Sequence, residues 1–149
     1  MATSPIPQDF SDFLRLLEDE DVEYLLIGGY AVGYYGYPRA TADMDVWIAV
    51  NPLNADRVVG ALTRFGMRAS DLTAELFLET GNVIRMGIPP MRLEIQTEIS
   101  GVEFADCFSR RCRVALGGVE INLISLADLK TNKRASGRHK DLEDLEHLP

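Results

Sequence analysis

The chain contains 149 residues, of which 46% are hydrophobic and 26% charged, a composition that is ordinary for a single globular domain spanning residues 1–149. Its formal net charge of −8 argues against non-specific wrapping of nucleic acid, which needs many phosphate contacts from lysine and arginine, but it does not exclude a small nucleotide. The chain has two cysteines, no apolar run near the roughly 20 residues of a membrane span and no signal-peptide pattern, so we expect a cytoplasmic protein without membrane association.

The first half of the chain alternates helical and extended patterns. Apolar side chains recur at helical spacing from Phe10 to Leu17, whereas residues 44–50 alternate apolar and polar side chains as a half-buried strand does. The Gly28-Gly29 pair predicts a turn between a strand and a short helix. The elements expected in this half are helix 10–17, strand 23–27, short helix 30–35, strand 44–50 and helix 52–65.

The second half carries clear turn and cap signals. Gly117-Gly118 separates two apolar runs and predicts a hairpin, while Ser125-x-x-Asp128 resembles a capping box opening a helix that ends at Gly137. We expect strands 82–86 and 92–97, short helix 102–108, hairpin strands 112–116 and 119–123, the capped helix, and a last helix 140–148. The predicted fold class is α/β (α+β): a small mixed β-sheet with helices packed mainly on one face and helices at the C-terminal end.

Three carboxylates fall on the polar faces of predicted strands. Asp43 and Asp45 are two residues apart on one strand, so their side chains point the same way and repel each other unless a cation lies between them. Glu94 lies on the polar face of a later strand whose other face is apolar. If the two strands are neighbours, the three carboxylates meet on the open side of the sheet. Such a set predicts a site for Mg²⁺ or Mn²⁺ at which a phosphoryl group is displaced in line.

Each signal also has a simpler interpretation. An Asp-x-Asp pair at the start of a strand is often a turn or a solvated edge. Glu94 alone is more often an exposed strand residue than a metal ligand, and glycine pairs mark many strand ends. The combination, in this order and at this spacing, favours the metal site.

The combination resembles the nucleotidyltransferase superfamily that includes DNA polymerase β and the kanamycin-modifying enzymes. The family pattern is Gly-Gly or Gly-Ser after a strand, an acidic-x-acidic pair about a dozen residues later, and a third acidic residue on a later strand. Here these are Gly28-Gly29, Asp43-x-Asp45 and Glu94. The run Arg39-x-Thr41-x-Asp43-x-Asp45 and the segment 123–148 look closest to minimal prokaryotic members such as the AbiEii-type toxin nucleotidyltransferases.

The resemblance implies transfer of a nucleoside monophosphate from an NTP to an acceptor hydroxyl, with release of pyrophosphate. It implies that Asp43, Asp45 and Glu94 are the catalytic and metal-binding residues. Gly28 and Gly29 would lie against the triphosphate. Gly29 stands where many members have serine, and Glu94 replaces the commoner aspartate.

Four further residues are candidates for contacts to the nucleotide. Arg39 and Thr41 lie in the loop before the acidic pair and could touch phosphate or organise the loop, and an ion pair between Arg39 and a nearby carboxylate is an equal alternative. Lys130 and Lys133 are one turn apart on a predicted helix. Either lysine could meet the β or γ phosphate, or both could belong to a solvated helix face.

We therefore expect a Mg²⁺-dependent, NTP-using enzyme, with ATP among the candidate nucleotides. The acceptor could be RNA, a protein or a small molecule, and a partner protein or a homodimer could hold it because the chain leaves little room for a second binding domain. The resemblance suggests a toxin–antitoxin or defence role. The alternatives are a non-catalytic nucleotide-binding or antitoxin-like regulatory module on the same fold, and an antibiotic-modifying adenylyltransferase.

Overall fold

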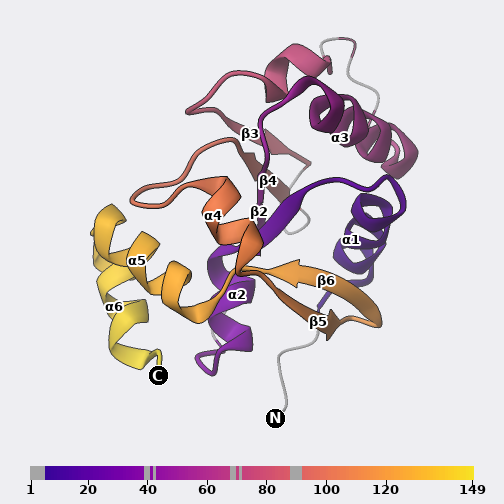
Figure 1. Cartoon of the computed structure of the whole chain (residues 1–149). Helices are drawn as coiled ribbons and strands as arrows, with labels where there is room; N and C mark the ends of the chain where they lie inside the picture. The colour runs from indigo at the N-terminus through magenta and orange to yellow at the C-terminus, as the bar shows by residue number, and fades with distance from the viewer. Residues whose placement is uncertain (1–5, 39–40, 42, 68–69, 71, 88–91) are drawn as a thin grey trace.

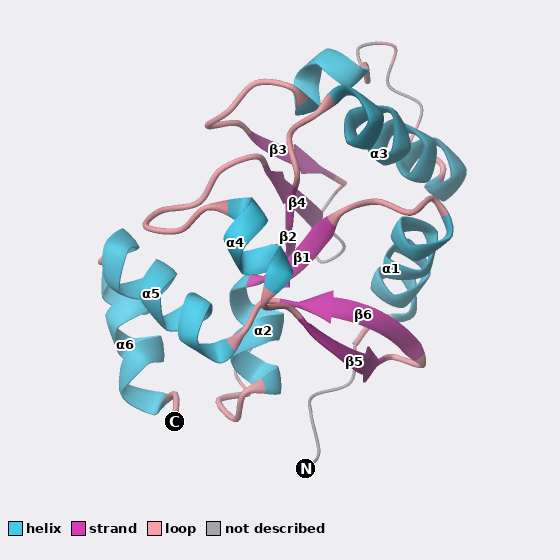
Figure 2. Ribbon diagram, in the orientation of Figure 1, coloured by secondary structure: helices cyan, strands magenta, loops and turns pink. Residues whose placement is uncertain are grey.

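A six-stranded mixed sheet organises the described part of the chain, which comprises residues 6–38, 41, 43–67, 70, 72–87 and 92–149 of a computed structural model (Figure 1). The elements are α1 (Gln8–Asp19), β1 (Tyr24–Ile27), α2 (Gly28–Tyr34), β2 (Asp43–Ile48), α3 (Pro52–Phe65), the 3-10 helix η1 (Ala74–Phe77), β3 (Val83–Met86), β4 (Arg92–Gln96), α4 (Phe104–Ser109), β5 (Cys112–Leu116), β6 (Val119–Leu123), α5 (Leu126–Ser136) and α6 (His139–His147). The strand order β3-β4-β2-β1-β6-β5 places β2, which carries the acidic pair, inside the sheet (Figure 2).

The predicted elements are present, and most of their bounds shift by one or two residues. The α2 helix begins at Gly28, so the glycine pair forms the first turn of this helix rather than a turn before it. The predicted strand 82–86 is the edge strand β3, and the short helix η1, which was not predicted, precedes it. The β5–β6 hairpin has the predicted bounds.

The apolar face of the sheet is buried under α1 and α3. Met44, Val46 and Ile48 alternate along β2 and are buried together with Leu93 and Ile95 of the adjacent β4. The buried residues of α1 and α3 that join this core are Phe10, Phe13, Leu14, Leu17, Ala55, Val58, Ala61 and Leu62. Burial of these side chains is the main favourable contribution to folding, and it leaves the polar residues of β2 on the opposite face.

Local capping defines both ends of α5. The hydroxyl of Ser125 accepts a hydrogen bond from the Asp128 backbone N–H at 3.1 Å and donates one to the Asp128 carboxylate at 2.9 Å. Gly137 follows the helix in the left-handed conformation, with φ 66°, which glycine adopts at little cost. The predicted start and end of this helix are confirmed.

Helices lie on both sides of the sheet. Figure 1 shows α1 and α3 on one side and α4, α5 and α6 on the other. The sequence predicted helices mainly on one face of the sheet. The packing of the second group was harder to recognise from apolar spacing, because α5 and α6 contact each other through the buried charged residues Lys133, Asp141 and Asp144 as well as through apolar ones. Among the helices formed by described residues, none has the length and apolar character needed to cross a membrane.

Candidate active site

The two strands that carry the acidic residues are neighbours, so the condition on which the sequence-based metal site depended is met. The β2 and β4 strands pair in parallel, and their register sets Asp45 beside Glu94 and Asp43 beside Arg92. Because side chains alternate along a strand, Asp43, Asp45 and Glu94 share the face opposite the apolar core. The strand register alone therefore brings the three carboxylates to one region of the sheet.

Gly28 places bare backbone against Asp45. The β1 strand is antiparallel to β2 with Ile27 opposite Asp45, so the chain enters α2 directly beside this carboxylate. The φ angle of Gly28 is +70°, and a Cβ atom built there would collide with the Asp45 carboxylate. Both the backbone conformation and the available space therefore require glycine.

Replacing Gly28 by alanine should destabilise the protein more than the backbone conformation alone explains. A left-handed φ costs a non-glycine residue about 1–2 kcal/mol, and the overlap with Asp45 should add about 1–3 kcal/mol. Gly118→Ala is the matched control, because Gly118 has φ +79° with no atom within 4 Å of an added Cβ. Urea denaturation of the two variants measures the difference. Equal losses of unfolding free energy would show that Asp45 does not lie against Gly28.

Asp45 is a half-buried carboxyl group among negative charges. Burial raises its pKa from 3.8 to about 7, with Glu94 and Asp43 adding to the rise and Lys140 and Lys133 opposing it. No described residue forms a hydrogen bond or an ion pair with the Asp45 side chain. A carboxyl group in this environment favours a bound proton or a bound cation.

The other two carboxylates each contact an arginine on the neighbouring strand. Arg92 Nε lies 3.3 Å from Asp43 Oδ1, and Arg85 Nε lies 3.6 Å from Glu94 Oε2. Within the described ranges, no group of three or more His, Cys, Asp or Glu side chains is close enough together to hold a metal ion. The carboxylates thus share one face of the sheet, but the outer two contact arginines rather than closing around Asp45.

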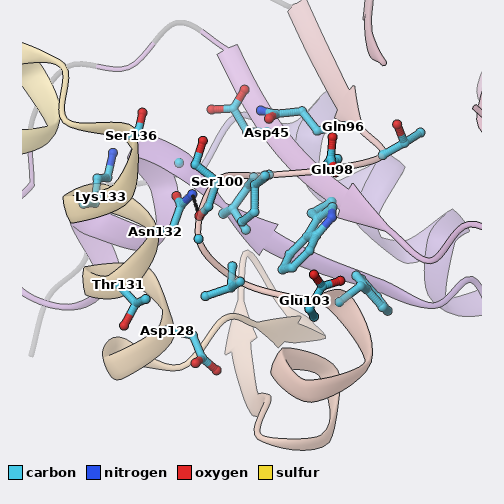
Figure 3. Close-up of a pocket in the computed structure, with 18 of the residues that line it drawn as sticks. Asp45, Gln96, Glu98, Ser100, Glu103, Asp128, Thr131, Asn132, Lys133 and Ser136 are labelled. Atoms are coloured by element: carbon cyan, nitrogen blue, oxygen red, sulfur yellow. Dashed lines mark hydrogen bonds between the residues drawn. The ribbon is translucent and has the colours of Figure 1, made fainter. Parts of the chain in front are cut away.

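A pocket of about 1090 Å³ opens over the face that carries Asp45 (Figure 3). Gly28, Gly29 and Asp45 line one part of it, and residues 96–104 line another. The α5 helix forms a further wall, and Asn132 on this helix donates a hydrogen bond to the Ser100 carbonyl at 3.0 Å. Small-molecule sites usually measure about 300–1,000 Å³, so this pocket has room for a nucleotide and part of a second reactant.

The two lysines predicted to contact phosphate, Lys130 and Lys133, have different surroundings in the structure. Lys133 lines the pocket, but its buried ammonium group lies 3.1 Å from Asp141 Oδ1 and 3.0 Å from Asp144 Oδ2. Lys130 lies outside the pocket lining and donates a hydrogen bond to the Pro149 carbonyl at 2.5 Å. Lys133 therefore joins α5 to α6, and Lys130 is not brought to the carboxylates.

Three other cations among the described residues line the pocket, and one of them, Arg110, pairs with Asp128 at 2.9 Å. Arg138 and Lys140 flank the start of α6, and each interacts electrostatically with Asp45. The Arg138 side chain is held by Asp141, whose Oδ2 lies 2.8 Å from Arg138 Nε. Neither residue was among the site residues predicted from the sequence. The signal was the basic cluster around Gly137, but only the docking of α6 against α5 brings it to Asp45.

Thr41 packs against the second glycine. A Cβ atom at position 29 would lie 2.5 Å from Thr41 Oγ1, and the same hydroxyl donates a hydrogen bond to the Asp43 carbonyl at 3.3 Å. Gly29 thus leaves room for Thr41, which in turn holds the start of β2. Arg39 lies outside the described residues, so its predicted contacts stay predictions.

Comparison with known proteins identifies the fold. No protein-family model matches the chain, and no curated protein is significantly similar to it. The structure resembles a candidate nucleotidyltransferase from Thermotoga maritima, with a TM-score of 0.60 and 18% identity over 92% of this chain and 88% of that chain. It also resembles an antigenic nucleotidyltransferase-like protein from Paracoccidioides brasiliensis, with a TM-score of 0.54 and 18% identity over 97% of this chain and 77% of that chain. The chain therefore has a nucleotidyltransferase-like fold, and the predicted fold class is confirmed.

Proposed function

We propose that this protein is a magnesium-dependent nucleotidyltransferase, which moves a nucleoside monophosphate from an NTP to an acceptor hydroxyl and releases pyrophosphate. The proposal rests on Asp45, which lines the pocket, lies beside Glu94 on the parallel strand and has the bare backbone of Gly28 against it. Asp43 and Glu94 are not among the residues that line the pocket. The fold that the chain shares with nucleotidyltransferase-like proteins agrees with this chemistry.

The donor set suits a hard divalent cation. Asp45 offers a carboxylate that forms no hydrogen bond or ion pair with a described residue, with Asp43 along the same strand and Glu94 across on the next. Mg²⁺ and Mn²⁺ favour a few carboxylates and complete their coordination with water and phosphate oxygens. The described side chains are not close enough together to hold an ion as they lie, so Asp43 and Glu94 would have to turn toward Asp45 for the three residues to hold the cation. The cation would neutralise charge on the triphosphate and on the departing pyrophosphate.

Other groups of the protein would bind the triphosphate and deprotonate the acceptor hydroxyl. The backbone at Gly28 and Gly29 permits close approach of the triphosphate, while Arg138 and Lys140 supply positive charge at the edge of the pocket. The acceptor oxygen forms a bond to the α-phosphorus as the bond from this phosphorus to the bridging oxygen breaks, and pyrophosphate leaves. Glu94 takes the proton of the acceptor hydroxyl as general base.

The acceptor and the biological role are also part of the proposal. The pocket of about 1090 Å³ has space for part of an acceptor, which is RNA, a protein or a small molecule. A partner protein or a second copy of the chain would hold the rest of the acceptor. The resemblance of the run 39–45 to the AbiEii-type toxins supports a toxin–antitoxin or defence role.

Transfer and binding should be measured on the same preparation. With an NTP labelled on its α-phosphate, Mg²⁺ and cell extract, the protein should label an acceptor, and the label should differ among the common NTPs. Calorimetry should show tighter NTP binding in Mg²⁺ than in EDTA. If no NTP produces label above that of an Asp45→Asn sample, the proposed function is wrong.

A second function is favoured by the contacts of the outer carboxylates. Because Asp43 and Glu94 already pair with arginines, the chain could bind a nucleotide as a non-catalytic regulatory module without gathering a metal. In that case, calorimetry would detect NTP binding that is insensitive to EDTA, and no acceptor would be labelled. The same two measurements therefore separate the two functions.

A further inference from the structure

Two arginines lie on the carboxylate face because the strand register puts them there. Arg92 on β4 is the direct partner of Asp43 on β2, and Arg85 on the edge strand β3 is the direct partner of Glu94 on β4. Directly paired residues project from the same face of a sheet, so each guanidinium group is within reach of one carboxylate. Both contacts are made through Nε, at 3.3 Å for Arg92 and 3.6 Å for Arg85.

Only two of the three carboxylates on this face of the sheet pair with an arginine that the structure describes. The outer carboxylates, Asp43 and Glu94, each contact a guanidinium group, whereas Asp45 beside them forms no hydrogen bond or ion pair with a described residue and interacts with Arg138 and Lys140 only at longer range. We propose that Arg85 and Arg92 are displaceable counter-ions, which neutralise Glu94 and Asp43 in the metal-free protein and must release them before a divalent cation binds. This inference rests on the proposed function, because it concerns the cation of that same site.

The exposure of the side chains makes release of the arginines feasible. The Arg85 and Arg92 side chains are 60% and 37% exposed, whereas those of Glu94 and Asp43 are 17% and 20% exposed. The guanidinium groups can therefore move into water without burying charge, and exposed ion pairs are weak. Lys133 is the contrasting case, because its side chain is 6% exposed between two buried carboxylates.

Release of the arginines would couple the cation to the nucleotide. A cation that arrives alone leaves two guanidinium groups without partners, whereas one that arrives with a triphosphate brings phosphate oxygens, which guanidinium groups bind well. Cation and triphosphate should therefore strengthen each other's binding, and this coupling is reciprocal by thermodynamic necessity. The coupling should weaken when the arginines are removed.

The test is a Mn²⁺ titration, followed by electron paramagnetic resonance, of the wild type, Arg85→Gln, Arg92→Gln and the double variant. Each single variant should bind Mn²⁺ about two- to fivefold more tightly in the absence of nucleotide, and the double variant about tenfold. Addition of a non-hydrolysable NTP should tighten Mn²⁺ binding less in the double variant than in the wild type. Arg113→Gln is the matched control. Arg113 lies on the other edge strand, β5, where its equally charged, 41% exposed side chain pairs with Glu18 of α1.

Nuclear magnetic resonance can follow the contacts between the two arginines and the carboxylates directly. The Nε–H signals of Arg85 and Arg92 should shift when Mg²⁺ is added to the wild type, with the same midpoint as metal binding. The Nε–H signal of Arg111, which donates to Asn122 at 3.2 Å, should not shift.

The outcomes separate this inference from the proposed function. If the wild type binds Mn²⁺ but the variants bind it no more tightly and the arginine signals stay in place, the inference is overturned and the proposed function stands. If only the arginine variants bind Mn²⁺, even when the non-hydrolysable NTP is present, the inference is supported and a magnesium-dependent function of the wild type is overturned. If neither the wild type nor any variant binds Mn²⁺ with or without the NTP, both are overturned.

Discussion

Replacing Asp45 by asparagine should abolish magnesium-dependent nucleotide binding while stabilising the metal-free protein at neutral and alkaline pH. Asp45 is the central carboxylate of the proposed cation site, and loss of even outer-shell partners weakens metal sites by 10–100-fold. We therefore expect NTP binding in Mg²⁺ to weaken by at least about 100-fold, as measured by calorimetry. Binding in EDTA should change little by comparison.

The gain in stability follows from the raised pKa of Asp45. Well below its ordinary pKa of 3.8, the carboxyl group is protonated in both the folded and the unfolded protein, so it contributes no penalty. As pH rises from there to about 7, the unfolded protein ionises this group while the folded protein resists, and stability falls. Asparagine removes the penalty, so the gain should be small near pH 4 and reach about 2–4 kcal/mol at pH 8.

Asp43→Asn is the informative comparison. Asp43 has Arg92 as a partner at 3.3 Å, so its replacement should weaken metal binding without raising the unfolding free energy at pH 8. Thermal or urea denaturation across this pH range measures both variants. An Asp45→Asn protein that binds Mg²⁺ and NTP like the wild type would place the cation site elsewhere.

Replacing Lys133 by methionine should lower the unfolding free energy by about 3–5 kcal/mol, because removal of one member of a buried ion pair leaves uncompensated charge. Its ammonium group contacts Asp141 and Asp144, and all three residues are buried. Burial alone would raise the pKa of Asp141, but hydrogen bonds from Arg138, Ser136 and Lys133 outweigh burial and hold this pKa below its ordinary value. Urea denaturation at pH 7 measures the loss.

Lys130→Met provides the matched control on the same helix. Lys130 is half-buried, and its ammonium donates to the Pro149 carbonyl in a solvent-exposed hydrogen bond, so its loss should change stability by no more than about 0.5 kcal/mol. Similar small losses in both variants would show that Lys133 is not held by the two aspartates. Lys133 would then be available for the phosphate contact that the sequence suggested.

Much of the fold could be predicted because its signals are local. Ser125 and Gly137 mark the ends of α5, and both act within one turn of the backbone. The alternation of apolar and polar residues along β2 and β4 assigned Asp43, Asp45 and Glu94 to a polar face, because the period of a strand is set by neighbouring residues. The neighbouring position of these strands was a conditional prediction, and the register of the sheet confirms it.

The cations of the site were harder to assign. Lys130 and Lys133 looked equivalent on a predicted helix, but the docking of α6 leaves Lys130 half-buried and buries Lys133 between two carboxylates. The same docking brings Arg138 and Lys140 to the pocket. The partner of a charged side chain depends on which elements pack together, so a helical pattern alone does not reveal it.

By itself, the sequence determined that a glycine pair follows the first strand and that three carboxylates lie on polar strand faces, because these properties depend on residues close together in the chain. Only the tertiary structure decided that Gly28 lies against Asp45 and that Arg85 and Arg92 contact the carboxylates on either side of it. Each contact joins two different elements of the fold, and the one between Arg92 and Asp43 spans 49 positions of the chain. Strand register and helix docking create them, and both are set by packing of the whole domain.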